Sequence, residues 1–506
     1  MQVTKSDGGH RGLAGVLSSA GAGVAGLIAG IVLLPIVIST VSAEQYGIWL
    51  VVSAIAQYLN YADLGVGTAV VHFGSRARAG GEQRTLGEFL QAGLIWNTMA
   101  MAVVVPVFAV IACLYLWSSK AERVLSPHES VGLLVIGLVM LSALLLKPFG
   151  SALNGAGLLP IERRNQGIGV VVRVALTLVA CLVFHDIVFV ATAEAVAVLV
   201  PVCLSWAQVR KRKLAPMRWT GFPSSTLRYM LSYSVRSFAV NAVGALLLQA
   251  GTIAAGVTLR PQDVTYYNAA FRVYTSVRQL IGWANDPFRP ALSRINVAAP
   301  AEAGRALMAI CFVTLSLSVV GCAVLMLAGR DLVRLWLGPD VPVGAIALTM
   351  VVLLVGLMVN AVHLPLIPAA DAAGAPGAFF VPQLIWMLMT VVGSLSLGAL
   401  LGLPGIALGL TLPLVVIEPF YLVRAAGVLG FTVRGWMRAV GVPVVLLAAG
   451  GAVMTGATAV ACRLGQVSTS GFAEAVAFLV GSGIVAVLMR KKLPWQSFVT
   501  MGRLEL

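Results

Sequence analysis

The sequence predicts an all-α polytopic membrane protein with two six-helix lobes and two additional C-terminal helices. Composition is the first reason, because the 506 residues are 59% hydrophobic and 10% charged, whereas soluble domains carry about 25% charged residues. Apolar segments long enough to cross a bilayer also recur along the whole chain. Finally, short motifs recur at a constant spacing, which indicates an internal duplication.

A membrane crossing needs about 20 consecutive apolar residues, and by that criterion we predict fourteen transmembrane helices. They cover residues 13–39, 45–72, 89–117, 130–154, 166–184, 187–209, 229–259, 264–294, 305–328, 343–370, 378–401, 404–423, 437–462 and 471–489. Two long apolar runs, 166–209 and 378–423, are divided only by short polar or Gly-Pro segments. The sequence is therefore compatible with twelve to fourteen crossings.

Positively charged residues predict the orientation, because cytoplasmic loops of membrane proteins are enriched in Lys and Arg. With the N-terminus placed in the cytoplasm, most of the 34 Lys and Arg residues fall in inside segments. Those in the opposite loops are Lys120, Arg123, Arg260, Arg330, Arg334 and Arg463. We therefore expect both termini in the cytoplasm. This bias explains most of the net charge of +15 without a nucleic-acid partner.

The duplication is clearest at the ends of the fourth and tenth spans, which share a pattern of Pro, then Asn or Asp, then Gly. The matching residues are Pro148 and Pro365, Asn154 and Asp371, and Gly157 and Gly374, each pair 217 positions apart. Repeats of this kind are typical of transporters, with the substrate path between the halves. We predict an N-terminal lobe at 1–213, a C-terminal lobe at 214–430, and two further helices with a cytoplasmic tail at 431–506.

The second span carries an acidic residue, Asp63, at membrane depth, close to Gln57 and Asn60. An ionisable group in a membrane span needs a partner, water or a function. One hypothesis is a gate in which Asp63, and Asp286 at the matching position of the second lobe, pair with arginines such as Arg289 or Arg76. The other is that Asp63 stabilises its own lobe where Gly65 and Gly67 loosen the helix.

The eighth span predicts a polar wall. At 100° per residue, its polar side chains fill one half of the helix, among them Tyr267, Arg272, Tyr274, Arg278 and Gln279. Such a half cannot face lipid, so it faces protein or water. Arg272, Arg278 and Asp286 could form a structural ion-pair network, or the half could line an aqueous cavity.

Arginine binds phosphate through two parallel hydrogen bonds and keeps its charge, and aromatic rings stack on sugar faces. A cavity of this kind suits an anionic pyrophosphate that carries sugars. The predicted cavity residues are Arg173, Arg236, Arg272, Arg278, Tyr267, Tyr274, Gln279, Gln57 and Asn60.

Enzymatic activity is not expected. The acidic residues of the outside loops form no DxD pair, and no loop is long enough to hold a catalytic domain for a glycosyltransferase or polymerase. The cysteines and histidines have no metal-binding spacing, so we expect neither cofactor nor metal. No GxxxxGK[ST] phosphate-binding loop is present, which favours an electrochemical gradient as the energy source. Candidate proton carriers or gate residues are Asp63, Asp286, Arg289, Glu194 and Glu418.

Several motifs resemble those of bacterial flippases that carry polysaccharide repeat units of the O-antigen type. They are EQYGIW at 44–49, YADLG at 61–65, LNGAG at 153–157 and RLWLG at 334–338. The resemblance covers residues 12–430. It extends to the multidrug/oligosaccharidyl-lipid/polysaccharide exporter superfamily, which also contains multidrug antiporters and lipid II flippases.

This resemblance implies two six-helix lobes around a V-shaped central cavity with cationic walls. It implies a polyprenyl-pyrophosphate-linked oligosaccharide as cargo, moved by alternating access to the outer leaflet of the bacterial inner membrane for lipopolysaccharide or exopolysaccharide biosynthesis. Membrane lipids and polysaccharide polymerase or export machinery are the implied partners.

Two alternatives remain within the superfamily. The extra C-terminal helices are similar to those of lipid II flippases, where they form a groove for the lipid tail. The arginine-rich first span of those flippases is missing, because residues 13–38 carry no charge. A multidrug or cation antiporter would have carboxylates, rather than arginines, dominating its cavity.

Overall fold

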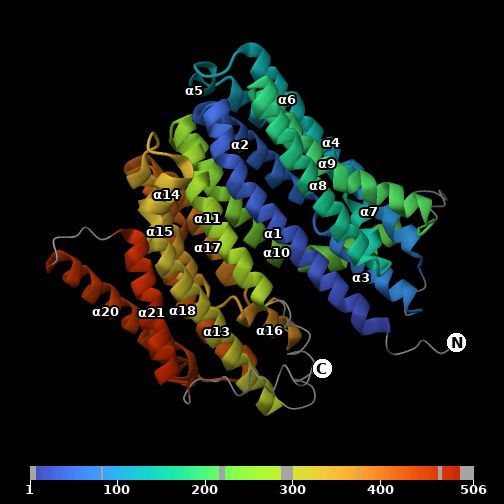
Figure 1. Cartoon of the computed structure of the whole chain (residues 1–506). Coiled ribbons are helices and arrows are strands. Elements are labelled where there is room, and N and C mark those ends of the chain that lie inside the picture. The colour runs from blue at the N-terminus through green and yellow to red at the C-terminus, as the bar shows by residue number, and fades with distance from the viewer. Residues whose placement is uncertain are drawn as a thin grey trace. The chain divides into compact units, whose positions relative to one another are not determined.

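The computed structural model describes residues 7–80, 84–215, 223–285, 300–373, 375, 377–464 and 470–490. Every regular element in these ranges is a helix (Figure 1). The chain divides into two compact units: the first contains the residues up to Gly256 and Arg260–Thr265, and the second contains Val257–Leu259 and the residues from Tyr266 onward. The lobe boundaries predicted at residues 213 and 430 stay a prediction.

The first unit is built from ten α-helices and two short irregular helical turns within the described ranges. They are α1 (Asp7–Thr40), α2 (Ala43–Leu59), the 3₁₀ turn Asn60–Asp63, α3 (Val66–Arg78), α4 (Leu86–Leu116), α5 (Ser119–Glu122), α6 (Pro127–Leu141), α7 (Ala143–Gly155), α8 (Leu159–Val179), the π turn Ala180–Phe184, α9 (Ile187–Lys211) and α10 (Ser224–Thr258). Helix α8 packs against α1 and α9, and α7 packs against α3, α4 and α9.

The second unit begins within α11 (Pro261–Asn285). Its other helices are α13 (Pro300–Leu327), α14 (Gly329–Leu337), α15 (Val343–Asn360), α16 (Leu366–Ala372), α17 (Phe380–Leu401), α18 (Leu403–Leu429), α19 (Val433–Trp436), the π turn Met437–Gly441, α20 (Val442–Leu464) and α21 (Gly471–Leu488). Helix α18 packs against α15 and α17. The last two helices, α20 and α21, form a pair that packs on α13.

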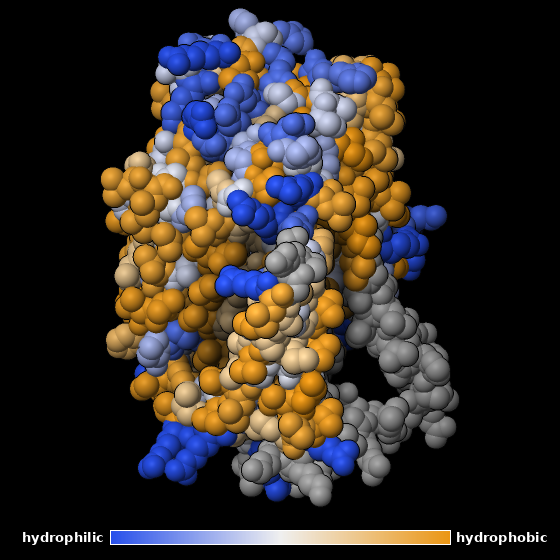
Figure 2. Space-filling view, turned by 60° about the vertical axis from the view of Figure 1, so that its left-hand side comes forward, coloured by the Kyte–Doolittle hydropathy of each residue, from blue (hydrophilic) through white to orange (hydrophobic). Residues whose placement is uncertain are grey.

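The chain is a multi-pass membrane protein. Within the described residues, ten helical segments are long and apolar enough to cross a membrane, and shorter apolar stretches occur at Gly26–Thr40 and Leu246–Thr258. Many large hydrophobic side chains are exposed, such as Leu114 at 73% and Val392 at 67%. Broad hydrophobic areas cover much of the face in Figure 2, and strongly hydrophilic residues gather near its top. The count of fourteen crossings and the orientation of the termini stay predictions.

Three of the predicted spans are not continuous helices. The span predicted at 45–72 is broken at Leu64 and Gly65, which have left-handed backbone angles (φ 47° and 73°). The span at 130–154 is divided at Ser142. The span at 343–370 turns after Asn360, before α16 begins. Hydrophobicity reports the length of a crossing and not its internal breaks, which explains why these were missed.

The two helix ends that share the repeated motif also share a backbone hydrogen bond. The N–H of Leu158 donates to the carbonyl of Leu153 over 2.8 Å, and the N–H of Ala375 donates to the carbonyl of Ala370 over 2.9 Å. Both bonds span five residues, which is the 6→1 bond of a Schellman helix ending. The donors and the acceptors are each 217 positions apart, the same spacing as the sequence motifs.

Candidate functional site

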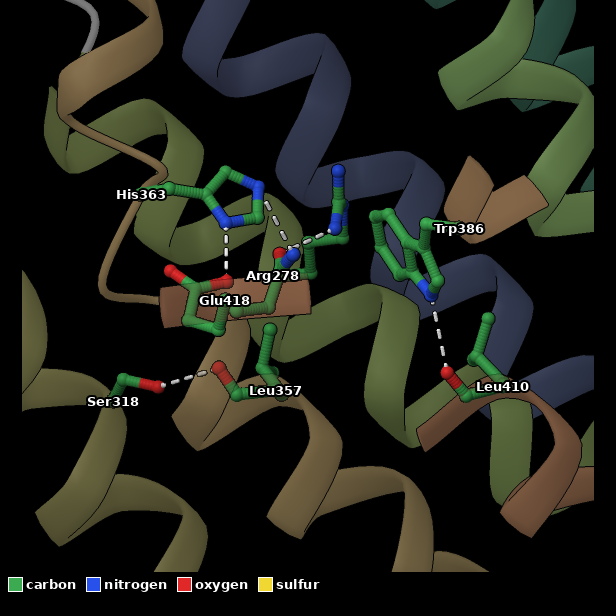
Figure 3. A network of polar contacts seen from close by, with 8 residues as sticks. Arg278, Ser318, Leu357, His363, Trp386, Leu410 and Glu418 are labelled. Carbon is green, nitrogen blue, oxygen red and sulfur yellow. Dashed lines mark hydrogen bonds and ion pairs between the residues drawn. The ribbon is translucent and has the colours of Figure 1, made fainter. Parts of the chain in front are cut away.

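A chain of four polar side chains crosses the interior of the second unit (Figure 3). Arg278 on α11 donates a hydrogen bond from Nη1 to Oδ1 of Asn360, the last residue of α15, over 2.7 Å. The amide nitrogen Nδ2 of Asn360 lies 3.3 Å from Nε2 of His363. On the other side of the ring, Nδ1 of His363 lies 2.6 Å from Oε2 of Glu418 on α18. We call these residues the Arg278–Glu418 chain.

The arginine determines where the protons of this chain lie. A guanidinium has donors and no acceptor, so the atom of Asn360 that faces Arg278 is its carbonyl oxygen. The amide nitrogen of Asn360 then faces His363 as a donor, and Nε2 of the ring accepts. The ring proton therefore lies on Nδ1 and is donated to Glu418. The imidazole is neutral in this arrangement, and the charges of Arg278 and Glu418 balance each other.

Aromatic side chains pack against the histidine ring. The ring of Tyr421 stacks on the ring of His363, with centroids 4.1 Å apart and an angle of 9° between the planes. Trp386 approaches edge-on at 6.4 Å. His363 is 3% exposed and Glu418 is 5% exposed. A buried charge is tolerated only when it is paired and hydrogen-bonded, so the four residues depend on each other.

Two polar atoms beside the histidine have no hydrogen-bond partner among the described residues. They are Oε1 of Glu418 and the hydroxyl of Tyr421, and both atoms are buried. An unpartnered buried carboxylate oxygen is costly, and in a native protein such an atom calls for an explanation. In the described part of the chain, no group of three or more His, Cys, Asp or Glu side chains could hold a metal ion.

The first unit contains a partly buried carboxylate, Glu194 on α9. Its Oε1 accepts a hydrogen bond from Nη2 of Arg173 on α8 over 2.8 Å, and the same contact is an ion pair. Its Oε2 accepts from the indole N–H of Trp49 on α2 over 2.7 Å, and the hydroxyl of Tyr46 donates to Oε1 over 3.4 Å. Three helices are thus joined through one carboxylate. This arrangement satisfies both oxygens of Glu194 and is typical of a structural contact.

Asp63 lies at the break between α2 and α3 and is 4% exposed. Its Oδ2 pairs with Nζ of Lys147 on α7 over 2.8 Å, and its Oδ1 accepts from the backbone N–H of Gly65 over 3.3 Å. The lysine amine also lies 3.5 Å from the carbonyl of Asn60. Within the described residues, the ion-pair partner of Asp63 is Lys147 of α7, and Arg289, one of the arginines expected there, lies outside them. These contacts support the second of the two interpretations, in which Asp63 stabilises its own lobe.

The remaining predicted cavity residues are spread over both units. Tyr267 and Tyr274 are each 1% exposed. The ring of Phe271 stacks on both, with ring centroids 5.6 Å from Tyr267 and 5.4 Å from Tyr274. Gln57 accepts a hydrogen bond from Gln249 at an exposed position over 3.1 Å. Their role in a cavity stays a prediction.

The remaining predicted site residues are Asn60, Gln279, Arg272, Asp286, Arg289 and Arg236. Asn60 donates to the carbonyl of Ala56 over 3.1 Å; Gln279 is exposed and Arg272 is partly buried on α11. Asp286, Arg289 and the side chain of Arg236 lie outside the described residues.

Sequence reasoning missed three residues that the structure places at these sites: Asn360, His363 and Lys147. The histidine was one of five scattered along the chain, and no spacing rule connects it to Glu418, which lies 55 residues away. The signal that was available is a His three residues after an Asn inside an otherwise apolar span. Polar residues at membrane depth are informative even when they are uncharged.

The comparisons with known proteins agree with the sequence motifs. A family model described as "Polysaccharide biosynthesis protein" matches residues 13–296, which is more than half of the chain. Comparison with curated protein sequences gives no significant match.

Solved structures share the fold at low sequence identity. A lipid II flippase, MurJ, in an inward closed conformation, matches with a TM-score of 0.70 and 11% identity, over 94% of this chain and 98% of that chain. An inward-facing multidrug resistance transporter of the MATE family and MOP superfamily matches with a TM-score of 0.62 and 13% identity, over 82% and 98% of the two chains. The eukaryotic MATE transporter AtDTX14 matches with a TM-score of 0.54 and 14% identity, over 83% and 97%. At these identities the likeness establishes the fold alone.

Proposed function

The chain belongs to the polysaccharide biosynthesis protein family, whose model matches residues 13–296, and from this premise we propose that it is a lipid-linked glycan flippase. Its cargo is a polyprenyl-pyrophosphate-linked oligosaccharide used in envelope polysaccharide biosynthesis. It moves this cargo from the cytoplasmic to the outer leaflet by alternating access. The family match is the observation that carries the proposal, because it connects a transporter fold with polysaccharide assembly.

Cationic side chains within the apolar helices support an anionic cargo. The side chains of Arg173 and Lys147 are 34% and 42% exposed, although each pairs with a carboxylate. Arg272 and Arg278 are partly buried on α11. Guanidinium and ammonium groups bind phosphate through charge-assisted hydrogen bonds, whereas a cationic drug would be repelled by them.

Lipid II is the second candidate cargo, and the extent of the structural match favours it. The MurJ match covers 94% of the chain, which leaves about 30 residues unmatched. The two C-terminal segments, Val433–Leu464 and Gly471–Leu488, have 32 and 18 residues. Together they are longer than the unmatched part of the chain, so they cannot both lie outside the match. The MATE match covers 82%. The match to the lipid II flippase therefore includes at least part of these two C-terminal segments.

The test is transport in proteoliposomes. Fluorescent polyprenyl-pyrophosphate oligosaccharide is placed in both leaflets, and a membrane-impermeant reducing agent quenches the outer probe. Flipping by the wild-type protein quenches nearly all of the probe, and empty vesicles quench about half. Lipid II and a fluorescent cationic dye are tested in parallel.

A matched control separates the cationic helix residues from general charge effects. Arg272→Ala removes a charge within α11. Arg260→Ala removes a charge just before α11, on a side chain that is 74% exposed and pairs with Asp263 in the first turn of the helix. Flipping is expected to fall in the first variant and to stay near wild type in the second. Movement of the cationic dye, with none of the glycolipid, would contradict the proposal. Preference for lipid II would favour the second candidate.

A further inference from the structure

The Arg278–Glu418 chain has a fixed donor direction, and this makes it sensitive to one added proton. Each group donates to the next, from Arg278 through Asn360 and His363 to Glu418. In this state every polar contact joins one donor to one acceptor. A further proton on the ring can bind only at Nε2, because Nδ1 already carries one.

When Nε2 is protonated, the ring becomes a hydrogen-bond donor toward Asn360 and needs an acceptor there instead of a donor. The amide nitrogen now faces another donor, which is unfavourable, so the amide must turn and present Oδ1 to the ring. After this turn, its NH₂ group faces the guanidinium of Arg278, which has no acceptor. The bond that holds Arg278 over 2.7 Å is therefore lost. One proton at the histidine breaks a contact on the far side of the asparagine.

The charge balance acts in the same direction. With a neutral ring, the carboxylate of Glu418 balances Arg278. With a charged ring, the close His363–Glu418 pair, at 2.6 Å, is neutral by itself and leaves Arg278 uncompensated. A cation at membrane depth without a counter-charge is costly. The protonated state therefore favours an external anion at Arg278.

We propose that His363 and Glu418 form a proton-binding site, and that a proton taken up there turns the Asn360 amide and releases Arg278 to bind a phosphate of the cargo. The groups that face His363 are known from each element around it within the described residues. Glu418 and Tyr421 come from α18, Arg278 acts through Asn360, and α17 contributes the uncharged Trp386. The last clause of the proposal rests on the proposed function.

Thermodynamic linkage gives the measurable consequence. If the proton and the anionic group both favour the state with a free Arg278, each raises the affinity of the other by the same factor. Binding of a polyprenyl pyrophosphate should then take up protons at His363. Coupling between sites typically changes affinity by about 5- to 150-fold, so we expect binding about tenfold tighter at pH 5.5 than at pH 8.5.

The first arm of the test needs no cargo. Protein labelled with ¹⁵N-histidine is reconstituted in lipid nanodiscs, and the ring nitrogens are followed by NMR between pH 5 and pH 9. The His363 signals are assigned with His363→Gln, and also from the spectra of four variants that replace the other histidines. We expect a neutral ring with the proton on Nδ1 at high pH, which gains a proton on Nε2 on acidification. A ring that stays neutral over the whole range would overturn the proton site.

The second arm uses farnesyl pyrophosphate as the probe. Binding and proton uptake are measured by calorimetry in buffers of different ionisation enthalpy. The same measurement on His363→Gln subtracts protons taken up by the ligand itself. With tenfold coupling, wild type is expected to take up at most about half a proton more than His363→Gln, and His72→Gln, which replaces a histidine of the first unit, is expected to match wild type.

The outcomes are distinguishable. Binding that depends equally on pH in wild type and His363→Gln would overturn the link to Arg278 while leaving the flippase proposal intact. Binding that follows sodium concentration and not pH would overturn the proton as the ligand. Failure of wild type to bind farnesyl pyrophosphate at any pH would overturn the Arg278 clause. The flipping assay decides the proposed function separately, and the NMR titration would still decide the proton site.

Discussion

The contact between Asp63 and Lys147 allows a quantitative prediction about how the break between α2 and α3 is stabilised. The carboxylate side chain is 6% exposed and the lysine side chain is 42% exposed, with 2.8 Å between Oδ2 and Nζ. Breaking a fully buried pair by removing one partner costs about 3–5 kcal/mol, because the other charge stays buried. Here the two partners differ in exposure, so the two single substitutions should differ in effect.

Lys147→Met keeps the length of the side chain and leaves the Asp63 carboxylate with one backbone N–H donor, that of Gly65. Because the lysine end is partly solvated, we reduce the expected cost to about 2–3 kcal/mol. Asp63→Asn keeps an oxygen for the Gly65 N–H and leaves Lys147 with access to water. Its expected cost is smaller, about 1 kcal/mol. The double variant should be more stable than Lys147→Met alone.

The assay is thermal unfolding of the purified protein in detergent, followed by tryptophan fluorescence. About 2–4 °C per kcal/mol is typical of domains of 150–250 residues, so Lys147→Met should lower the melting temperature by about 4 °C or more. Arg260→Met, which breaks an ion pair whose arginine side chain is 74% exposed, serves as the control, with a change within about 0.5 kcal/mol.

Equal losses in the two single variants that add in the double variant would contradict an interaction between Asp63 and Lys147, because additive effects mean that the two groups do not interact. A different result would revive the gate hypothesis. If Asp63→Asn leaves the melting temperature unchanged but increases labelling of a cysteine placed in the predicted cavity, Asp63 controls access.

Three further predictions concern transport and packing. Replacing both Arg272 and Arg278 with Ala should abolish glycolipid flipping, and replacing both with Lys should preserve part of it, since Lys keeps the charge and loses the two parallel hydrogen bonds; near-normal flipping by the Ala variant at equal membrane levels would contradict this. Gly67→Ala should lower the melting temperature, because the new Cβ would lie 2.8 Å from Oγ of Ser151, and Ser151→Ala in the same chain should restore most of the loss; no restoration would show that the contact is not the cause. Because the proton and the cargo favour the same state, a proton gradient should increase net flipping only when the acidic side is the side from which the cargo is taken, and an ionophore should remove this increase; an unchanged rate would exclude proton-driven transport.

The sequence was sufficient to predict the class of protein, because crossing a bilayer imposes a strong constraint on composition and segment length. It also showed the repeated motif, whose two copies end their helices with the same backbone bond at Leu158 and Ala375. The break at Leu64 and Gly65 was less visible. Gly65 suggested a loosened helix, but a left-handed Leu64 depends on the local fold and cannot be predicted from a leucine.

The carboxylates of the polar sites could be predicted more readily than their partners. Asp63, Glu194 and Glu418 were chosen because each is a carboxylate at membrane depth, and each does have a partner in the structure. The partners Lys147 and His363 could not be chosen, because pairing depends on how helices distant in sequence pack together. A single sequence shows that a charged residue lies within an apolar segment, but it does not show which group pairs with that residue.

The shared helix ending has a consequence for biogenesis. At both positions the last turn closes with a bond between residues five apart, so the signal that stops the helix is contained within its own few residues. Such a stop can form as soon as the segment has been synthesised and inserted, before any later helix is available to pack against it. Chains are synthesised from the N-terminal end, so the helix ending at Leu158 can form while the ending at Ala375 is still on the ribosome.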